Sequence, residues 1–317
     1  MNIKKIGLSA LAGSLVATSA YAGAVTVAGG ASMNVEHTNG GFGNTGKTFS
    51  MSNQLTFSGS GELDNGLNVS ISFILDQGDN ETDTTTGAGT APFDSHSVSV
   101  SSDALGTLKL SGEGGSSATS ALDGTAAGDV WDNFDGTGDI TPTGVGTGAN
   151  MFMYTLPSMM DDLAVNISYL PTGSAAQSAV GYSATFSGVD GLSVSYAAGD
   201  GTNDTTDATV LKASYAYGPV TVAWSNYEYD ASGTSSDNET TSYKVSYTVS
   251  DDLSISYGAE TIEEGTSKDV ETASIKASYT TGGMTISLAS EEIENSAGTT
   301  AATEDRERWA LGASFAF

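Results

Sequence analysis

The stretch Arg308-Trp309-Ala310-Leu311-Gly312-Ala313-Ser314-Phe315-Ala316-Phe317 decides the fold. Positions of one parity, from Trp309 to Phe317, carry Trp, Leu, Ala, Phe and Phe, and the positions between them are mostly small or polar. This period of two predicts a β-strand with one apolar face. In a water-soluble protein such a strand would be a sticky sheet edge. In an outer-membrane barrel it pairs with the first strand and removes the edge. We therefore predict that this stretch closes a barrel and that Phe317 lies at the closure.

The amino-terminal 22 residues have the features of a cleaved secretory signal. Lys4 and Lys5 precede a short apolar stretch over residues 6–18, and Ala20-Tyr21-Ala22 forms an A-x-A cleavage site. The alternative, an uncleaved anchor helix, is disfavoured because the apolar run is too short to span a bilayer. We expect residues 1–22 to be removed and residues 23–317 to form a single β-barrel domain.

The composition excludes several classes of function. Cleavage would leave eight basic residues against 38 Asp and Glu, a net charge of about −30. A nucleic-acid partner is excluded because the chain has no basic surface to displace counterions. The chain contains no cysteine, so it has neither disulfides nor thiolate metal sites. The carboxylates must instead face water, divalent cations or cationic solutes.

Short alternating segments follow one another from residue 24 onward, separated alternately by tight turns and by long, acidic loops rich in Gly, Thr and Ser. This alternation of turn and loop is typical of an all-β, antiparallel up-and-down transmembrane barrel. The pattern predicts sixteen strands, over residues 24–37, 47–62, 67–77, 94–103, 106–112, 150–156, 163–170, 177–187, 192–199, 207–217, 219–229, 239–249, 253–263, 269–280, 284–294 and 304–317. In nearly every strand one parity is apolar and the other is Ser, Thr, Asn, Lys or Glu, which suits a water-filled lumen.

A repeat of 32 residues runs through the second half of the chain. Lys212, Lys244 and Lys276 stand at equivalent places in three similar segments, and one further step reaches Arg308. Each step corresponds to one pair of strands. The repeat therefore predicts a series of cations that point into the lumen from alternate strands.

The mature sequence resembles the Gram-negative general porins, and most closely their alphaproteobacterial branch. The resemblance is carried by four stretches: Val25-Thr26-Val27-Ala28-Gly29-Gly30-Ala31-Ser32-Met33, Glu62-Leu63-Asp64-Asn65-Gly66-Leu67, Leu105-Gly106-Thr107-Leu108-Lys109-Leu110 with Ser120-Ala121-Leu122-Asp123-Gly124, and Phe317. It implies a 16-stranded barrel in the Gram-negative outer membrane, a homotrimer and passive diffusion of small hydrophilic solutes. It also implies that the third loop, here residues 113–149, folds into the barrel and narrows it. We expect the trimer contact near the first five strands, since small residues such as Gly29 and Ala31 permit close packing.

Charged residues within and around the third loop are the candidate pore residues. The acidic set on the predicted constriction loop is Glu113, Asp123, Asp129, Asp132, Asp135 and Asp139. The basic set in lumen parity is Lys109, Lys212, Lys244, Lys276, Arg306 and Arg308. The family usually has an arginine-rich wall on its early strands, which this sequence lacks. Its cations either face the loop across the lumen, or lie beneath the loop and pair with its acids, which would hold it in place. Their late position in the sequence favours the second arrangement.

Two acidic loop segments have the oxygen density that Ca²⁺ prefers, although neither keeps the spacing of an EF-hand. The candidate ligand sets are Asp132, Asp135 and Asp139, and Asp76, Asp79 and Asp83. No cofactor is expected apart from such a structural Ca²⁺, which would reduce repulsion or bridge to lipopolysaccharide. The two histidines, His37 and His96, lack the partners of a metal site or a catalytic triad, and no hydrolase or nucleotide motif occurs.

These observations predict an outer-membrane diffusion porin that is not an enzyme and prefers cations. Its partners would be the outer membrane with its lipopolysaccharide, two further copies of the chain, and small solutes and ions. Two alternatives remain at the level of sequence: a secreted acidic β-rich surface-layer or adhesin protein, and a substrate-specific channel with the same architecture.

Overall fold

The structure is a computed structural model that describes residues 25–40, 46–76, 94–134, 145–158, 160, 162–172, 177–202, 206–231, 237–265, 268–296, 298 and 305–317. The predicted signal, residues 1–22, lies outside these ranges, and so do most of the long loops. The division into signal and barrel domain therefore stays a prediction.

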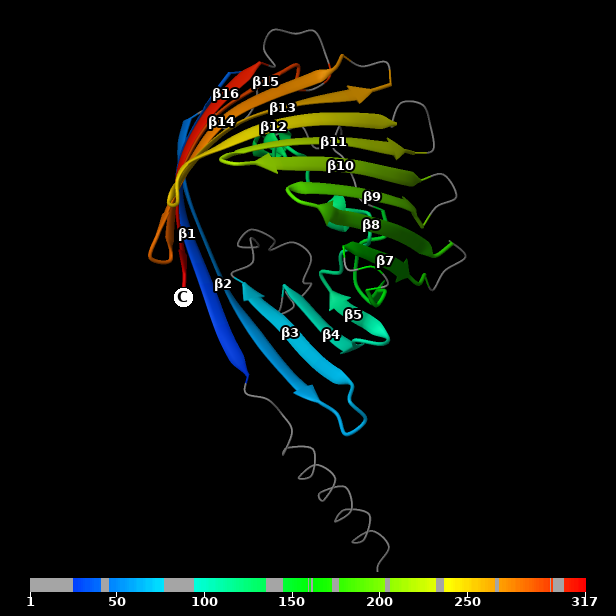
Figure 1. Ribbon diagram of the computed structural model, residues 1–317. Helices are drawn as coiled ribbons and strands as arrows, with labels where there is room; N and C mark the ends of the chain where they lie inside the picture. Colours follow the sequence, from blue (N-terminus) through cyan, green and yellow to red (C-terminus); the bar gives the residue numbers. More distant parts are fainter. Residues whose placement is uncertain are drawn as a thin grey trace, which may run out of the picture.

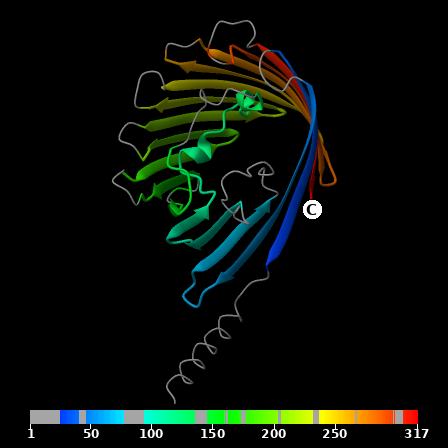
Figure 2. The same cartoon turned by 180° about the vertical axis from the view of Figure 1, so that it is seen from behind.

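Sixteen antiparallel strands close into one barrel in which each strand pairs with its neighbours in sequence and the last pairs with the first (Figures 1 and 2). The bounds are β1 (Thr26–Asn39), β2 (Gly46–Glu62), β3 (Asn68–Asp76), β4 (Ser95–Ser102), β5 (Gly106–Glu113), β6 (Met151–Thr155), β7 (Leu163–Leu170), β8 (Ala179–Val189), β9 (Leu192–Asp200), β10 (Asp207–Tyr217), β11 (Val220–Asp230), β12 (Asn238–Ser250), β13 (Leu253–Glu264), β14 (Val270–Thr281), β15 (Met284–Glu294) and β16 (Arg306–Ala316). The predicted strand number, order and up-and-down topology are confirmed. No helix among the described residues is long and apolar enough to cross a membrane.

The seam between β1 and β16 joins the two ends of the barrel. The strands run in register from the pair Gly30–Ala316 to the pair Asn39–Glu307. Beyond them, the Phe317 amide donates to the Gly29 carbonyl at 3.0 Å, and the Gly29 amide donates to the Phe317 carbonyl at 2.7 Å. A methyl group on Gly29 would lie 2.3 Å from the Phe317 ring. Gly29 is therefore small because the terminal aromatic ring covers it.

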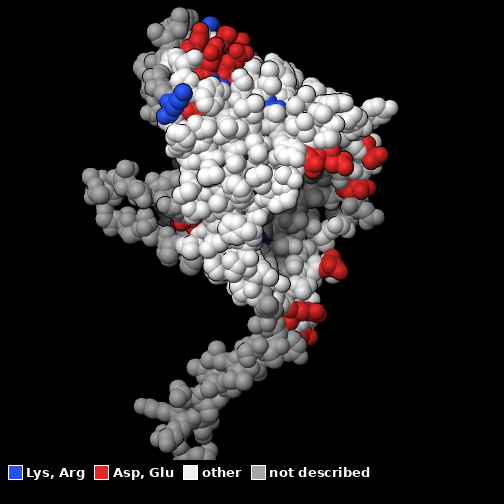
Figure 3. Space-filling model, turned by 90° about the vertical axis from the view of Figure 1, so that its left-hand side faces the viewer, with Lys and Arg blue, Asp and Glu red and all other residues white. Residues whose placement is uncertain are grey.

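The two faces of the wall differ as the alternation predicts. Large apolar side chains are exposed on the outer face, among them Phe49 at 84%, Tyr217 at 76% and Ile275 at 62%. Figure 3 shows one side of the wall as a mostly uncharged surface, with carboxylates gathered at its edges. Such a band suits contact with hydrocarbon. The buried apolar residues lie elsewhere, between the wall and the segment that follows β5.

The prediction for the fold concerns Gly106, the first residue of β5, which is the strand that leads into the segment between β5 and β6. Gly106 has a φ of +74°, and a Cβ there would lie 2.2 Å from the Thr155 carbonyl oxygen. Gly106→Ala should therefore lower the free energy of unfolding by about 3 kcal/mol, since the alanine would suffer both backbone strain and a clash with the backbone. We expect the folded band in unheated detergent gels to disappear at a clearly lower temperature.

Gly66→Ala is the matched control. Gly66 has a similar φ of +82°, but a Cβ there would have no neighbour within 4 Å. In this variant the free energy of unfolding should fall by only about 1–2 kcal/mol, because the left-handed backbone conformation is unfavourable for alanine. Equal loss of stability in the two variants would contradict the proposed role of the contact at Gly106.

Candidate functional site

The chain between β5 and β6 enters the barrel and follows its inner wall. We call its described part, residues 114–134 and 145–150, the inner loop. The Gly115–Gly148 bridge joins the two arms of the loop at its base. The first arm contains two short 3₁₀ turns, Ser120–Leu122 and Val130–Asn133. Figure 2 shows this segment inside the curve of the strands, as the resemblance to porins implied.

Serine hydroxyls of the wall accept hydrogen bonds from the backbone of the inner loop. Three such bonds have the same length of 2.9 Å and reach three different strands: Ala118 N to Ser168 Oγ, Ala126 N to Ser225 Oγ, and Ala127 N to Ser242 Oγ. A buried loop backbone needs such partners because its amide groups have lost water. Inward-facing serines therefore fix the path of the loop.

Glu260 on β13 is a deeply buried carboxylate acceptor, with only 2% of the residue exposed. Its carboxylate accepts hydrogen bonds from the Trp131 amide at 3.3 Å and the Thr272 hydroxyl at 3.2 Å, and from the Thr125 hydroxyl. Over the described ranges, no lysine or arginine forms an ion pair with it. Two of the three donors that stabilise this carboxylate, Trp131 and Thr125, belong to the loop. The burial of the carboxylate therefore depends on the loop being in place.

The anchoring groups form one line around the inner wall. Successive partners in the sheet register are Lys212, Ser225, Ser242, Glu260, Thr272 and Ile293, one from each of β10 to β15. Because paired residues of neighbouring strands point to the same side of a sheet, all six face the lumen. The loop is therefore fastened along a single row of the barrel.

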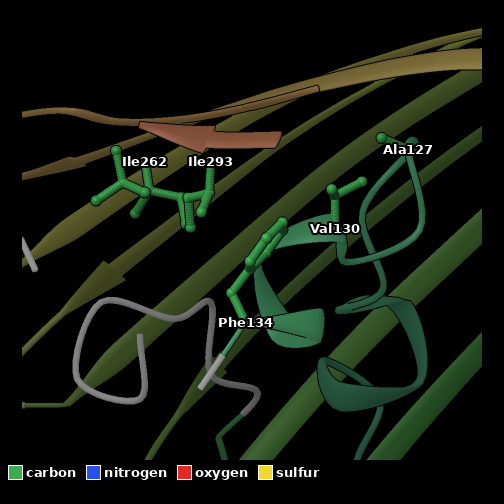
Figure 4. Packing of buried hydrophobic residues seen from close by; sticks show 6 residues of the cluster. Ala127, Val130, Phe134, Ile262 and Ile293 are labelled. Carbon is green, nitrogen blue, oxygen red and sulfur yellow. The ribbon is translucent and has the colours of Figure 1, made fainter. Parts of the chain in front are cut away.

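Apolar packing adds to these hydrogen bonds. Ala127, Val130 and Phe134 of the inner loop pack against Ile262 and Ile293 of the wall, as Figure 4 shows, with Val270 completing the cluster. A second cluster joins Val145 to the wall residues Ala197, Ala208, Val210 and Tyr227. These wall residues stand on the inward parity that the sequence analysis described as polar. Where the loop covers the inner face, that face therefore carries apolar residues as well as hydrogen-bond acceptors.

Two residues of the predicted basic set contact the inner loop directly. The Lys212 ammonium donates to the Gly124 carbonyl oxygen. The Arg306 guanidinium lies 5.8 Å from the centre of the Phe134 ring, a distance at which a cation–π attraction acts. Both lie beneath the loop, and the contacts described for them are to a carbonyl oxygen and to an aromatic ring. That these cations hold the loop by pairing with its acids stays a prediction.

Arg308 and Lys276 take part in a charged network beside the tip of the loop. Arg308 donates to Glu36 on β1, with an Nε–Oε2 distance of 3.0 Å, and to Glu291 on β15 at 2.5 Å. Lys276 lies 3.2 Å from the other Glu291 oxygen, which also accepts a 3.2 Å bond from the Asn133 amide group. The network links the loop tip to strands from both ends of the chain.

The other two predicted cations form no hydrogen bond or ion pair with the loop in the part of the chain that is described. Lys244 lines a cavity of about 530 Å³ on the lumen wall, together with Lys276 and Arg308. Lys109 is exposed on β5, where it pairs with Ser99 of β4. The predicted basic set is thus divided among the underside of the loop, the cavity wall and an early strand.

The predicted acidic set is also divided. Asp123 and Asp129 lie half-buried in the inner loop, where Asp129 accepts a 2.9 Å bond from the Thr125 amide. Burial raises the pKa of Asp123 above its usual value of 3.8, the Asp129 carboxylate raises it further, and Lys212 opposes the shift. Asp132 is exposed, and Glu113 lies 4.0 Å from His96. Asp135 and Asp139 fall outside the described residues.

The calcium candidates are only partly covered. Asp76 is exposed at the end of β3, Asp132 lies in a 3₁₀ turn, and Asp79, Asp83, Asp135 and Asp139 lie outside the described ranges. Within those ranges, no three His, Asp or Glu side chains form a group suited to a metal ion. Calcium binding stays a prediction.

The main anchors, Glu260 and Glu291, are absent from the predicted site. Their position in the polar, inward parity of the strands does not distinguish them from other lumen-facing residues. The signal that could have found them is the interruption of that parity by Val210, Tyr227, Ile262, Val270 and Ile293. An apolar residue facing a wet lumen needs a cover.

Comparisons with known proteins agree with this architecture. The family model described as Gram-negative porin matches residues 7–316. Among solved structures, a five-fold mutant of Rhodopseudomonas blastica porin has a TM-score of 0.68 and 16% identity, and covers 93% of this chain and 100% of its own. A triple mutant of that porin has a TM-score of 0.67 and 15% identity with the same coverage. At such identities the structures show a common fold only. No curated protein sequence matches.

The first prediction for the site tests Glu260 as the anchor of the inner loop. Trp131 can report on the loop if Trp224 and Trp309 are both replaced by Phe. In that background, Glu260→Ala removes the acceptor of the Trp131 amide and the Thr125 hydroxyl. Hydrogen bonds to a charged group each contribute about 1.5–3 kcal/mol. We expect the Trp131 emission to shift to the red and the loop to become sensitive to protease.

Glu263→Ala is the control, because Glu263 is an exposed carboxylate on the same strand. It removes the same charge without touching the inner loop. Unchanged Trp131 emission in Glu260→Ala would show that this carboxylate does not hold the loop.

The second prediction concerns pH. The pKa of Asp123 is raised in the docked loop, so its ionised form opposes docking at neutral pH, and this penalty disappears once the pH falls below the ordinary value of 3.8. Asp123→Asn should therefore strengthen docking at pH 7 and change little at about pH 3. The urea midpoint of Trp131 emission at both values measures this. A lower urea midpoint of Asp123→Asn at pH 7 would contradict the prediction that the ionised Asp123 opposes docking.

Proposed function

Because this chain belongs to the Gram-negative porin family and is a β-barrel of the outer membrane, we propose that it is a cation-preferring diffusion channel for small hydrophilic solutes. The observation that carries this proposal is the inner loop, which is fastened inside the closed barrel by Ser225, Ser242 and Glu260. A loop in this place narrows the lumen without filling it, since a cavity lined by charged and hydroxyl groups remains beside it. Pore width and wall charge then select the solutes.

The excess of carboxylates supports the preference for cations. The chain has 38 Asp and Glu against ten Lys and Arg. Four of the six predicted cations are engaged within the wall or under the loop: Lys212 with a carbonyl, Arg306 with the Phe134 ring, and Lys276 and Arg308 with carboxylates. Their field is therefore partly neutralised, whereas Asp132 on the inner loop stays exposed. Within a low-dielectric wall, such unpaired carboxylates concentrate cations.

The assembly we propose is a homotrimer whose outer rim contacts lipopolysaccharide. Contact between barrels near β1 to β5 is compatible with small outward residues such as Ala31, although Gly29 is covered by the chain's own Phe317 ring. Like-charged pairs such as Glu292–Glu307 and Glu228–Glu239 lie opposite each other. Divalent cations between the protein and lipid phosphates would relieve that repulsion.

The alternative of a secreted adhesin or surface-layer protein is not favoured, because the exposed apolar outer wall suits a membrane. Porins are channel proteins rather than enzymes, and the inner loop and wall form a site for passage. The remaining alternative, a substrate-specific channel, depends on a solute-binding site in the lumen.

The test is the zero-current potential of the purified protein in planar bilayers across a tenfold KCl gradient. We expect the sign that marks preference for K⁺. Neutralising Glu113, Asp123, Asp129 and Asp132 together should move the potential toward zero by a large part of its value, with conductance retained. The mass of the unheated assembly gives the number of subunits in the same preparation. An anion-selective potential would overturn the proposed preference.

A further inference from the structure

A cavity of about 530 Å³ opens on the lumen wall beside the tip of the inner loop. Its volume lies in the usual range of small-molecule sites, about 300–1,000 Å³. Strands β12 to β16 form most of its wall, β1 and β2 contribute Asn34, Glu36 and Ser50, and Asn133 of the inner loop borders it. The cavity thus lies on the path that a solute would take past the loop.

Both carboxylates of the cavity are already neutralised. Glu36 accepts from the Arg308 guanidinium, and Glu291 accepts from Arg308, Lys276 and Asn133. These bonds leave the two acids little capacity to attract a cationic solute. The carboxylates therefore hold the arginine and the lysine in place rather than recognise a ligand.

Lys244 supplies the remaining charge. Over the described residues its ammonium forms no ion pair or hydrogen bond, although the residue is half-buried in the wall. The lining contains three cations, Lys244, Lys276 and Arg308, and two carboxylates. The cavity is therefore locally positive in a strongly acidic protein, and its one unengaged charge faces the solute space.

Serine hydroxyls form the floor of the cavity next to these lysines. Ser246 pairs with Ser256, and Ser254 pairs with Ser278, which in turn pairs with Ser287. Their hydroxyls make no hydrogen bond to another described residue, so they are free to bind water or solute. Five hydroxyls spread over four strands match a chain of hydroxyl groups better than a compact ion.

We propose that this cavity is a binding subsite for small polyhydroxylated carboxylates, the class of sugar acids. The inference rests on the proposed channel function and adds a solute class to it. The carboxylate of the solute binds the Lys244 ammonium, and its hydroxyls exchange hydrogen bonds with the serine floor. A neutral sugar lacks the charge for Lys244, and the described residues of the lining include no aromatic side chain on which a sugar ring could stack.

A subsite of this kind has a role in an acidic channel. The overall negative charge repels an anion at the pore mouth, so an anionic nutrient would enter slowly. A local positive site lowers its energy near the narrowest part of the path, where conduction requires binding that is favourable but weak. Binding should therefore be in the millimolar range and should show as brief interruptions of the ion current.

The experiment measures single-channel current in KCl while sodium gluconate is added on one side, with equal glucose as the neutral comparison. We expect gluconate, but not glucose, to produce interruptions whose frequency saturates with concentration. Lys244→Ala should raise the apparent dissociation constant about three- to tenfold, since one charge-assisted contact in a wet site is lost. Lys244→Arg should restore most of the binding.

Lys47→Ala is the matched control, because it removes the same charge from an exposed position on β2, opposite the outward-facing His37. Gluconate interruptions should be unchanged in it. A channel that conducts KCl without gluconate interruptions, or with interruptions that Lys244→Ala leaves intact, overturns the subsite but not the channel. Absence of any conductance overturns the proposed function and the subsite with it.

Discussion

The structure depends on the pairing of β1 with β16, because no backbone group in a hydrocarbon layer can remain without a hydrogen-bond partner. An open sheet of sixteen strands would have two free edges and would be unstable in a membrane, and closure converts both edges into one more ladder. The pairing continues beyond the strand itself to Phe317 and Gly29. Every other feature, including the apolar outer wall and the polar inner wall, presupposes that this ladder is complete.

Closure leaves the inner loop in an unusual environment. It is enclosed like the core of a soluble protein, but the surface facing it belongs to a polar lumen. The wall therefore combines two kinds of contact along the same row: hydroxyl and carboxylate acceptors for the loop backbone, and apolar patches for Val130 and Phe134. The buried apolar residues of this barrel lie between loop and wall, which is why the interior can be specific in shape and still contain water.

Much of the fold could be predicted from the sequence. The period of two fixed the strands, several of which agree to the residue, such as 163–170, 207–217 and 284–294. The lumen-facing cations could also be predicted, because the repeat placed Lys212, Lys244 and Lys276 on one parity. The partners of these cations could not. Glu291 is joined to Arg308 only through the register of β15 and β16, and Glu260 receives the Trp131 amide from a loop 129 residues away. Neither relation leaves a trace in local periodicity.

The same limit explains the inward apolar residues. Ile262, Val270 and Ile293 break the polar parity near the end of each strand, where a pattern of short strands is least regular. Their meaning depends on the loop that covers them, and that loop is rich in Gly, Ala and Asp, without a pattern of its own. Only the three-dimensional path shows which part of the wall it protects.

The network that joins Asn133, Glu291, Arg308 and Glu36 has a consequence for the order of assembly. It unites the middle of the chain with strands that are 272 residues apart in sequence, since Glu36 belongs to β1 and Arg308 to β16. Contacts of such long sequence separation form late, because the entropy of the intervening chain must be lost first. The tip of the loop acquires its final partner only when the barrel has closed. A partly inserted chain therefore lacks the final constriction, and no open pore of defined size forms in the membrane before the barrel closes.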